Sequence, residues 1–512
     1  MSSLAFPPRA ARRRGSRNRA LPALFETHGV DVLLGVALTG FAVALLGFLP
    51  SSFNVDSWLA LVTGRELWHS GLPHHEVLTS MSFGKTWIDQ QWGAQLATYG
   101  LFLAGGLNLV GVVNVVLIVV AVAGGVIGAR RLGASPRSVL AALPLCLALV
   151  GDSHEVRTQE FAMPLFIACV YLLARDSRTP SRRVYWCLPI LVLWANLHGS
   201  ATLGAGLVAL RGLTVAWERR SSLRSTARAW VRPLVLTVGA PLCLLATPYG
   251  AGILSYYRTM LLGNSVMKAV SEWQPITSST MVAVPFFIAA ALALWCVGRN
   301  STRTTAFERL ALLALGVISI EVVRNALFFG LFALLVLPLL LGLSERHGAE
   351  ADTARRRRGV INLALSGVAA LALIVGVSAA FARPASSTEY HYIQPGVLQT
   401  VERATSANPS LRTLSDVRFS DWLLWRDPAL AGRIAYDTSW ELLTPAQMNS
   451  LQAVFGVVGT NWKRAADGYR LLVLDQHAEP AAAAAFRAEP GARVLYDDGQ
   501  SIVILRSASE AG

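Results

Sequence analysis

Long apolar segments separated by short basic loops are the feature of this sequence that most restricts what it can fold into. A run of about 17–25 apolar residues matches the thickness of a bilayer, and a helix satisfies its own backbone hydrogen bonds there. The sequence therefore predicts a polytopic α-helical membrane protein with about 11 spans. The expected spans cover residues 31–50, 107–128, 136–150, 161–174, 184–196, 199–217, 233–246, 280–298, 309–323, 326–343 and 359–381.

The composition agrees with a membrane protein. Only 15% of the 512 residues are charged and 53% are hydrophobic, whereas a soluble domain carries about 25% charged residues. The formal net charge is +14, from 45 basic and 31 acidic residues. The arginines gather in loops on one side of the predicted spans, which is typical of cytoplasmic loops rather than of a nucleic-acid-binding surface. We therefore expect membrane lipid, and no nucleic acid, as a partner.

Three regions follow from this pattern. Residues 1–30 are expected to form a basic cytoplasmic tail, because the apolar segment after them is longer than that of a signal peptide and lacks a small-residue cleavage site. Residues 31–383 are expected to form the transmembrane domain, with a first outer loop at 51–95. An odd number of spans then places residues 384–512 outside, in a multi-pass protein of the plasma or inner membrane.

The first outer loop holds two candidate catalytic acids, Asp56 and Asp89. Apolar residues at helical spacing predict helices over 56–70 and 90–104, and Gly71-Leu72-Pro73 is expected to end the first helix. A carboxylate at the membrane edge can serve as a general base. The alternative for Asp56 is structural, because an Asp just before Ser57 is a favoured helix N-cap.

Other polar residues are predicted on the same outer face, where a shared cavity would collect them. Arg157 and Arg324 adjoin spans on the outer side, against the positive-inside bias, so they are candidates for binding a phosphate; the alternative is that they extend to lipid headgroups. A divalent cation is the one cofactor left open, because two adjacent histidines on a loop are a weak ligand set, and no metal ligands are assigned. The remaining candidates for substrate binding are Gln159, His198, Glu272, His74 and His75.

The C-terminal region has a different pattern. Short β-rich runs are predicted to be strands at 411–416, 433–437, 454–460, 469–475, 493–497 and 501–506, with helices near 395–406, 443–453 and 479–488. Asp498-Gly499 between the last two runs indicates a hairpin. We expect a small α/β domain, and it contains no nucleophile elbow, P-loop or dinucleotide-binding motif.

An ordered set of motifs carries a resemblance. The runs DSWLALVTGRELWHSGLP (56–73) and SFGKTWIDQQW (82–92) are followed by RTQEF (157–161), WANLHGS (194–200), TPYG (247–250), EWQP (272–275), SDWLLWRDP (420–428) and RIAYD (433–437). This set resembles a poorly characterised bacterial branch of the GT-C superfamily of membrane glycosyltransferases. The resemblance implies a GT-C-like fold, a polyprenyl-phosphate-linked sugar as donor and an acid of the first outer loop as catalytic group. Asp56 matches that position and Asp89 is the second acid of the loop, although the adjacent pair of acids common in the superfamily is absent.

These observations together predict a glycosyltransferase that moves a sugar from a polyprenyl-phosphate donor to an envelope glycan or lipid acceptor on the extracytoplasmic face. Two alternatives stay open at this point. The chain could instead be a non-catalytic protein that binds or transports a lipid-linked glycan, or a structural subunit of an envelope-assembly complex.

Overall fold

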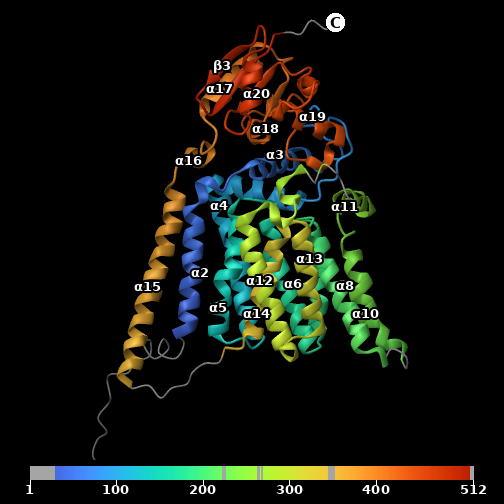
Figure 1. Ribbon diagram of the computed structural model, residues 1–512, viewed down its shortest axis with the longest axis vertical. Helices are drawn as coiled ribbons and strands as arrows, with labels where there is room; N and C mark the ends of the chain where they lie inside the picture. The colour runs from blue at the N-terminus through green and yellow to red at the C-terminus, as the bar shows by residue number, and fades with distance from the viewer. Residues whose placement is uncertain (1–28, 222–225, 262–265, 267–268, 344–351, 508–512) are drawn as a thin grey trace, which may run out of the picture.

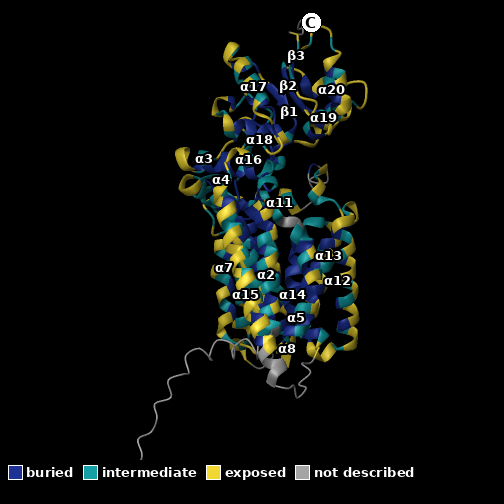
Figure 2. Cartoon of the chain, turned by 90° about the vertical axis from the view of Figure 1, so that its left-hand side faces the viewer, coloured by how far each residue is buried: buried dark blue, intermediate teal, exposed yellow. Residues whose placement is uncertain are grey.

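The computed structural model describes residues 29–221, 226–261, 266, 269–343 and 352–507. A bundle of long helices occupies one end of the molecule, and a small sheet flanked by helices caps the other (Figure 1). Buried residues fill the middle of the bundle and the inside of the cap (Figure 2). The predicted basic tail, residues 1–30, lies almost wholly outside the described residues, and the orientation of the two ends relative to a membrane remains a prediction.

Each of the predicted apolar segments coincides with a helix, because continuous Leu, Val and Ala runs have no polar group that would interrupt helical hydrogen bonding. Within the described residues, five helical segments are long and apolar enough to cross a membrane, which fits a membrane location, while the number of crossings remains a prediction. The helices are α2 (Gly29–Gly47), α4 (Trp92–Arg131), α5 (Pro136–Val150), α6 (Ala162–Arg178), α7 (Cys187–Ala195), α8 (Ala201–Glu218), α10 (Val231–Cys243), α12 (Thr280–Arg299), α13 (Ala306–Glu321), α14 (Ala326–Leu341) and α15 (Asp352–Ala382).

Helix α14 is the centre of the bundle. Its residues from Ala326 to Leu340 are all buried, and it packs against α4, α5, α12 and α13. Gly330 permits the close approach of α5, since a Cβ there would lie 2.7 Å from the Leu149 Cβ. Helix α15 packs beside α2 at the edge of the bundle, and most of its surface is exposed (Figure 1). That apolar exposed surface is what a lipid-facing helix requires.

The first outer loop contains two helical pieces, in agreement with its pattern. Helix α3 (Val55–Ser70) ends at Gly71, whose φ of +80° stops the helix as predicted. The predicted helix over 90–104 is the first part of α4, and a kink with non-helical backbone at Gly105 and Gly106 separates it from the part that continues to Arg131. Gly106 has a φ of +66°, so this bend depends on a residue without a side chain.

The cap is built on a four-stranded sheet with the order β1-β2-β4-β3. Strand β1 (Thr413–Ser415) is parallel to β2 (Leu471–Asp475), whereas β4 (Ser501–Leu505) is antiparallel to β2 and to β3 (Arg493–Asp497). Asp498 and Gly499 connect β3 to β4, which confirms the predicted hairpin. Helices α17 (Pro395–Ala407), α18 (Val417–Arg426), α19 (Pro445–Gly456) and α20 (Pro480–Arg487) complete this sheet domain, residues 395–507.

Two predicted strands of the sheet domain are wrong. The run 454–460 begins inside α19, because Thr444 and Gln447 form a capping box that starts a helix extending to Gly456. The run 433–437 makes only isolated bridges, from Ile434 to Thr413 and Thr79. Helix α18 was not predicted; the Asp416 side chain begins it by accepting a hydrogen bond from the Arg418 amide.

The first outer loop is hydrogen-bonded to the sheet domain. The Ser80 and Met81 amides donate to the Ile434 and Ala435 carbonyls at 2.8 and 3.0 Å. The Lys85 ammonium donates to the Leu442 carbonyl at 2.6 Å, and the Arg65 guanidinium of α3 donates to two carbonyls at the end of α18. Segments more than 350 residues apart therefore form one continuous structure at this end of the bundle.

Candidate functional site

A cavity of about 580 Å³ lies where the first outer loop, the end of the bundle and the sheet domain meet. It is lined from one side by the start of α3 and the chain at 90–95, and from another by α11 (Ile253–Leu261) and the short turns η4 (Thr158–Phe161), η9 (Ser271–Trp273) and η12 (Val323–Asn325). Thr438, Trp440 and Glu441 of the sheet domain line it as well. The site is thus formed only when distant parts of the chain come together.

Asp56 lines this cavity and does not hold the N-cap position of α3. Asn54 is the N-cap residue, and its backbone amide donates a hydrogen bond to the Ser57 hydroxyl at 3.1 Å. Asp56 is the second residue of the helix, where a negative charge still interacts favourably with the helix dipole. The structural alternative for Asp56, that it is the N-cap residue of the helix, is therefore wrong.

Arg157 brings three carboxylates together. Its Nε lies 3.2 Å from Oδ2 of Asp56, and its two terminal nitrogens contact Glu155 and Glu272. Arg324 lies 3.8 Å from Glu272 and donates to the Gln159 side chain at 2.8 Å. The predicted binding residues Arg157, Gln159, Glu272 and Arg324 therefore lie together on the cavity wall beside Asp56.

The charges of this cluster follow from burial and pairing. Burial raises the pKa of Asp56, and the neighbouring Arg157 opposes that rise without cancelling it. Burial also favours the neutral form of Glu272, but Arg157 and Arg324 outweigh it and hold the pKa of Glu272 below its ordinary value. Burial lowers the pKa of Arg157, yet Asp56 and the glutamates outweigh that effect, so the guanidinium stays charged. The cluster holds a carboxylate with base character beside two cations.

His198 lines the same cavity as a neutral imidazole. Burial and the two nearby guanidinium groups lower the pKa of His198 to about 3. Its Nδ1 accepts a hydrogen bond from the Ser200 amide at 3.2 Å, which leaves the proton on Nε2. His198 can therefore donate a hydrogen bond to a ligand but cannot supply a positive charge at neutral pH.

Asp89, His74 and His75 are placed differently from Asp56. Asp89 is only 3% exposed and lies behind the wall that its neighbours Gln90 and Gln91 form; burial raises the pKa of Asp89 to about 7. His74 and His75 are exposed and do not line the cavity; the ring of His74 lies against Tyr249 instead. Among the described residues no group of three potential ligands could hold a metal ion.

The part of the wall that the sheet domain contributes was not predicted. Trp440 and Glu441 line the cavity, and burial raises the pKa of Glu441 to about 7. Tyr256 and Tyr257 of α11 were also not predicted. The polar run DTSWE (437–441), which begins at the end of the RIAYD motif, is the sequence signal that could have drawn attention to the Trp-Glu pair.

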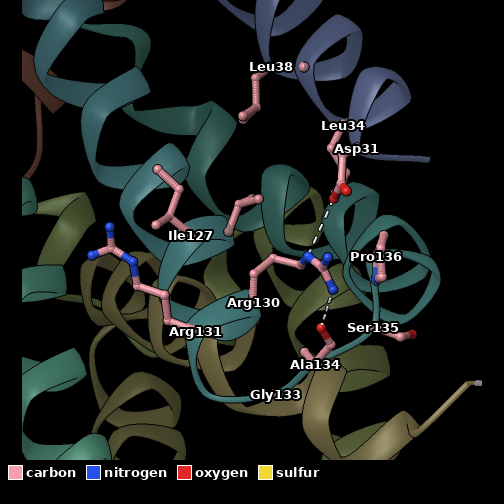
Figure 3. A pocket seen from close by; sticks show the side chains of 12 residues that line it. Asp31, Leu34, Leu38, Ile127, Arg130, Arg131, Gly133, Ala134, Ser135 and Pro136 are labelled. Atoms are coloured by element: carbon pink, nitrogen blue, oxygen red, sulfur yellow. Dashed lines mark hydrogen bonds and ion pairs between the residues drawn. The ribbon is translucent and has the colours of Figure 1, made fainter. Parts of the chain in front are cut away.

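A second cavity, of about 650 Å³, opens between α2 and α4 at the other end of the bundle. Figure 3 shows Arg130 reaching towards Asp31, at a distance of 3.4 Å, and towards the Ala134 carbonyl, at 2.7 Å. This pairing neutralises Arg130, and apolar side chains such as Leu34 and Ile127 form much of the wall. The groups needed for acid–base chemistry are gathered in the first cavity, which we take as the candidate site.

Comparison with known proteins finds similarity at the level of structure alone. No protein-family model and no curated relative matches the sequence. An oligosaccharyltransferase from Archaeoglobus fulgidus in its apo form is 11% identical, covers 93% of this chain and 74% of its own, and has a TM-score of 0.48. ArnT from Cupriavidus metallidurans, bound to undecaprenyl phosphate, is 13% identical, covers 95% of this chain and 99% of its own, and has a TM-score of 0.47.

The described residues form a mostly helical chain with a small C-terminal sheet. Neither structure reaches a TM-score of 0.5 or an identity of 25%. The function of this chain therefore has to be argued from its own residues.

Proposed function

We propose that this chain is a GT-C type glycosyltransferase that transfers a sugar from a polyprenyl-phosphate donor to a hydroxyl group of an envelope glycan or lipid acceptor. The observation that carries the proposal is the position of Asp56, whose carboxylate lies 3.2 Å from the Arg157 guanidinium in a cavity at the end of an apolar bundle. A base and a cation for a leaving phosphate are the two groups that such a transfer needs.

The proposed reaction is a single displacement at the anomeric carbon of the sugar. Asp56 accepts the proton of the acceptor hydroxyl as its oxygen forms the new bond to that carbon. The bond from the carbon to the phosphate oxygen breaks, and its electron pair leaves with the polyprenyl phosphate. Arg157 and Arg324 stabilise the negative charge on that phosphate, and His198 can donate a further hydrogen bond through Nε2. The displacement inverts the configuration at the anomeric carbon.

The wall of the cavity also suits a lipid-linked donor. Apolar side chains from α3, α8, α11, α13 and α14 line it beside the polar cluster, and an isoprenoid chain can leave the site along such a surface. Thr438 and Glu441 of the sheet domain add polar groups to the wall, and a polar acceptor would bind beside them. The apolar lining residues are Leu59, Leu203, Met260, Leu261, Ile318 and Phe328.

Substitution of Asp56 tests the proposal. We expect Asp56→Asn to lower transfer from a labelled polyprenyl-phosphate sugar by at least about 100-fold, because a general base contributes roughly 100- to 10,000-fold to a rate. Expression and thermal unfolding should stay close to those of the wild type, since Asn54 caps α3. Asp467→Asn, the same change at an exposed position of the sheet domain, is the matched control. A fully active Asp56→Asn protein would overturn the assignment of the base.

The same assay separates the alternative functions. A binding or transport protein would bind the labelled donor without releasing a transferred sugar, and its activity would depend on a membrane gradient. A structural subunit would tolerate Asp56→Asn and Asp89→Asn but lose its role when residues 384–512 are removed.

A further inference from the structure

The two guanidinium groups assigned to the donor phosphate already share an anion. Glu272 places Oε1 against a terminal nitrogen of Arg157 and Oε2 3.8 Å from Nη1 of Arg324. A carboxylate held between two guanidinium groups has the arrangement in which a lipid phosphate would bind them, with one unesterified oxygen facing each cation. Glu272 therefore stands at the position that a ligand phosphate would need.

The charges in the cluster determine which carboxylate would compete with a phosphate for the two guanidinium groups. The cluster contains two guanidinium groups, those of Arg157 and Arg324. It contains four carboxyl groups, those of Asp56, Glu155, Glu160 and Glu272. Burial raises the pKa of Asp56, Glu155 and Glu160, so these three accept a proton readily. Glu272 keeps its charge, because both guanidinium groups favour its ionised form. A phosphate entering the cluster would meet Glu272 as its main competitor for the two cations.

The segment that carries Glu272 lies against η12 at the end of the bundle, and its Trp273 packs against the buried core of the sheet domain. It is a single short turn, η9, and the Gln274 carbonyl that follows it accepts a hydrogen bond from the Val323 amide at 2.9 Å. Trp273 lies under the Arg324 guanidinium, 5.2 Å from its carbon to the ring centre. Residues 270–273 form one wall of the cavity. Moving this wall outwards would take Glu272 away from both guanidinium groups and leave Arg157 paired with Asp56 and Glu155.

We propose that Glu272 is an internal substitute for the donor phosphate: it neutralises Arg157 and Arg324 in the empty site, and the phosphate displaces it together with the turn at 271–273. This inference rests on the proposed function, because it takes the anion to be the phosphate of an isoprenoid lipid. It reassigns Glu272 from a group that binds the substrate to one that competes with it. The role of Arg157 and Arg324 is unchanged.

Binding of farnesyl phosphate, a short isoprenoid phosphate, to the full-length protein in detergent tests the proposal. We expect Glu272→Gln to bind farnesyl phosphate roughly tenfold more tightly than the wild type, because a ligand that must displace a competing state binds with reduced apparent affinity. Farnesol, which lacks the phosphate, should bind both proteins alike. Glu321→Gln is the matched control, since Glu321 ends α13 near the same cavity and is exposed.

A second measurement uses the wild-type protein and does not depend on the stability of a variant. Hydrogen–deuterium exchange of the peptide covering residues 270–276 should become faster when farnesyl phosphate is added, because the turn leaves its place. Unchanged or weaker binding by Glu272→Gln, or slower exchange in that peptide, would overturn the role of Glu272 while leaving the proposed function intact. Failure of every protein to bind farnesyl phosphate, together with absence of transfer, would reject the proposed function and this inference with it.

Discussion

At the scale of single residues, the candidate site depends on the contacts that the Arg157 guanidinium group makes. Arg157 carries five N–H donors in a fixed plane, and it meets Asp56, Glu155 and Glu272 from three directions. A lysine could offer the charge but not this geometry. The position of Asp56 in the cavity is therefore held by a residue from a different loop, 101 positions further along the chain.

Buried acids at the contact between the first outer loop and the sheet domain make stability depend on pH. Glu76 is fully buried, and its Oε1 accepts hydrogen bonds from the Leu78 and Thr79 amides at 2.6 and 2.8 Å. Burial, with a smaller effect of Asp437, raises the pKa of Glu76 to about 8. The folded protein thus keeps a proton that the unfolded chain loses above its ordinary pKa of 4.5. This contribution to stability is complete below that pH and is lost as the pH rises towards 8.

We expect Glu76→Gln to unfold at a higher temperature than the wild type at pH 8, because glutamine stays neutral and can accept the same two hydrogen bonds. A difference on the order of 3 °C would correspond to about 1 kcal/mol. The two proteins should unfold together near pH 4, where Glu76 is protonated in both states. Intrinsic tryptophan fluorescence during heating measures this, with Glu402→Gln on α17 as the control. A difference that is independent of pH would contradict the explanation.

At the scale of elements, the crossing of α3 over α4 sets the position of Asp56. Gly64 of α3 lies so close to α4 that a Cβ would be 2.4 Å from the Gln95 carbonyl oxygen and 2.8 Å from the Tyr99 Cβ. Arg65, the next residue, is bonded to the carbonyls of Leu424 and Trp425. The helix that carries the candidate base is therefore fixed from below by α4 and from above by α18.

Gly64→Ala should separate α3 from α4 and disturb the site without touching a polar residue. We expect a loss of stability of about 1–3 kcal/mol, as for other overpacked contacts, and a clear loss of transfer activity. Gly100→Ala in α4 is the matched control, because nothing lies within 4 Å of its Cβ position. Thermal unfolding and the transfer assay measure both variants. Equal behaviour of the two would show that the crossing tolerates adjustment.

At the scale of the whole molecule, the sheet domain is part of the site rather than an appendage. The chain enters it from α15 through exposed residues near Pro384, yet its main contacts are with the first outer loop and α3. Four of its residues line the cavity. The domain is therefore joined covalently to α15, but its main contacts are with the first outer loop and α3.

Cleavage of the covalent connection should leave the molecule assembled. We expect a specific protease site inserted after Pro384 to be cut while the two fragments still elute together in detergent, because the hydrogen bonds from residues 80–85 and Arg65 remain. Arg65→Ala combined with Lys85→Ala should release the C-terminal fragment after the same cut. Size-exclusion chromatography distinguishes the two results. Immediate release of the fragment from the otherwise unchanged protein would show that the contacts do not hold the domain.

The sequence by itself determined the elements that depend on local pattern. Apolar runs predicted the helices, Gly71 predicted the end of α3, and Asp498-Gly499 predicted the β3–β4 hairpin. These features follow from periodicity, backbone hydrogen bonding and turn chemistry, which act over a few residues. The failed strand at 454–460 shows the limit, since a capping box ten residues earlier determined its structure.

Only the tertiary structure decided which of the polar candidates share a site. Asp56, Arg157, Glu272 and Arg324 meet in one cavity, whereas Asp89, His74 and His75 do not line it. The sheet domain adds Trp440 and Glu441, which were not predicted. The physical reason is that the ion-pair partners and the burial of a carboxylate depend on the residues that pack around it. Packing brings these residues together from segments hundreds of positions apart.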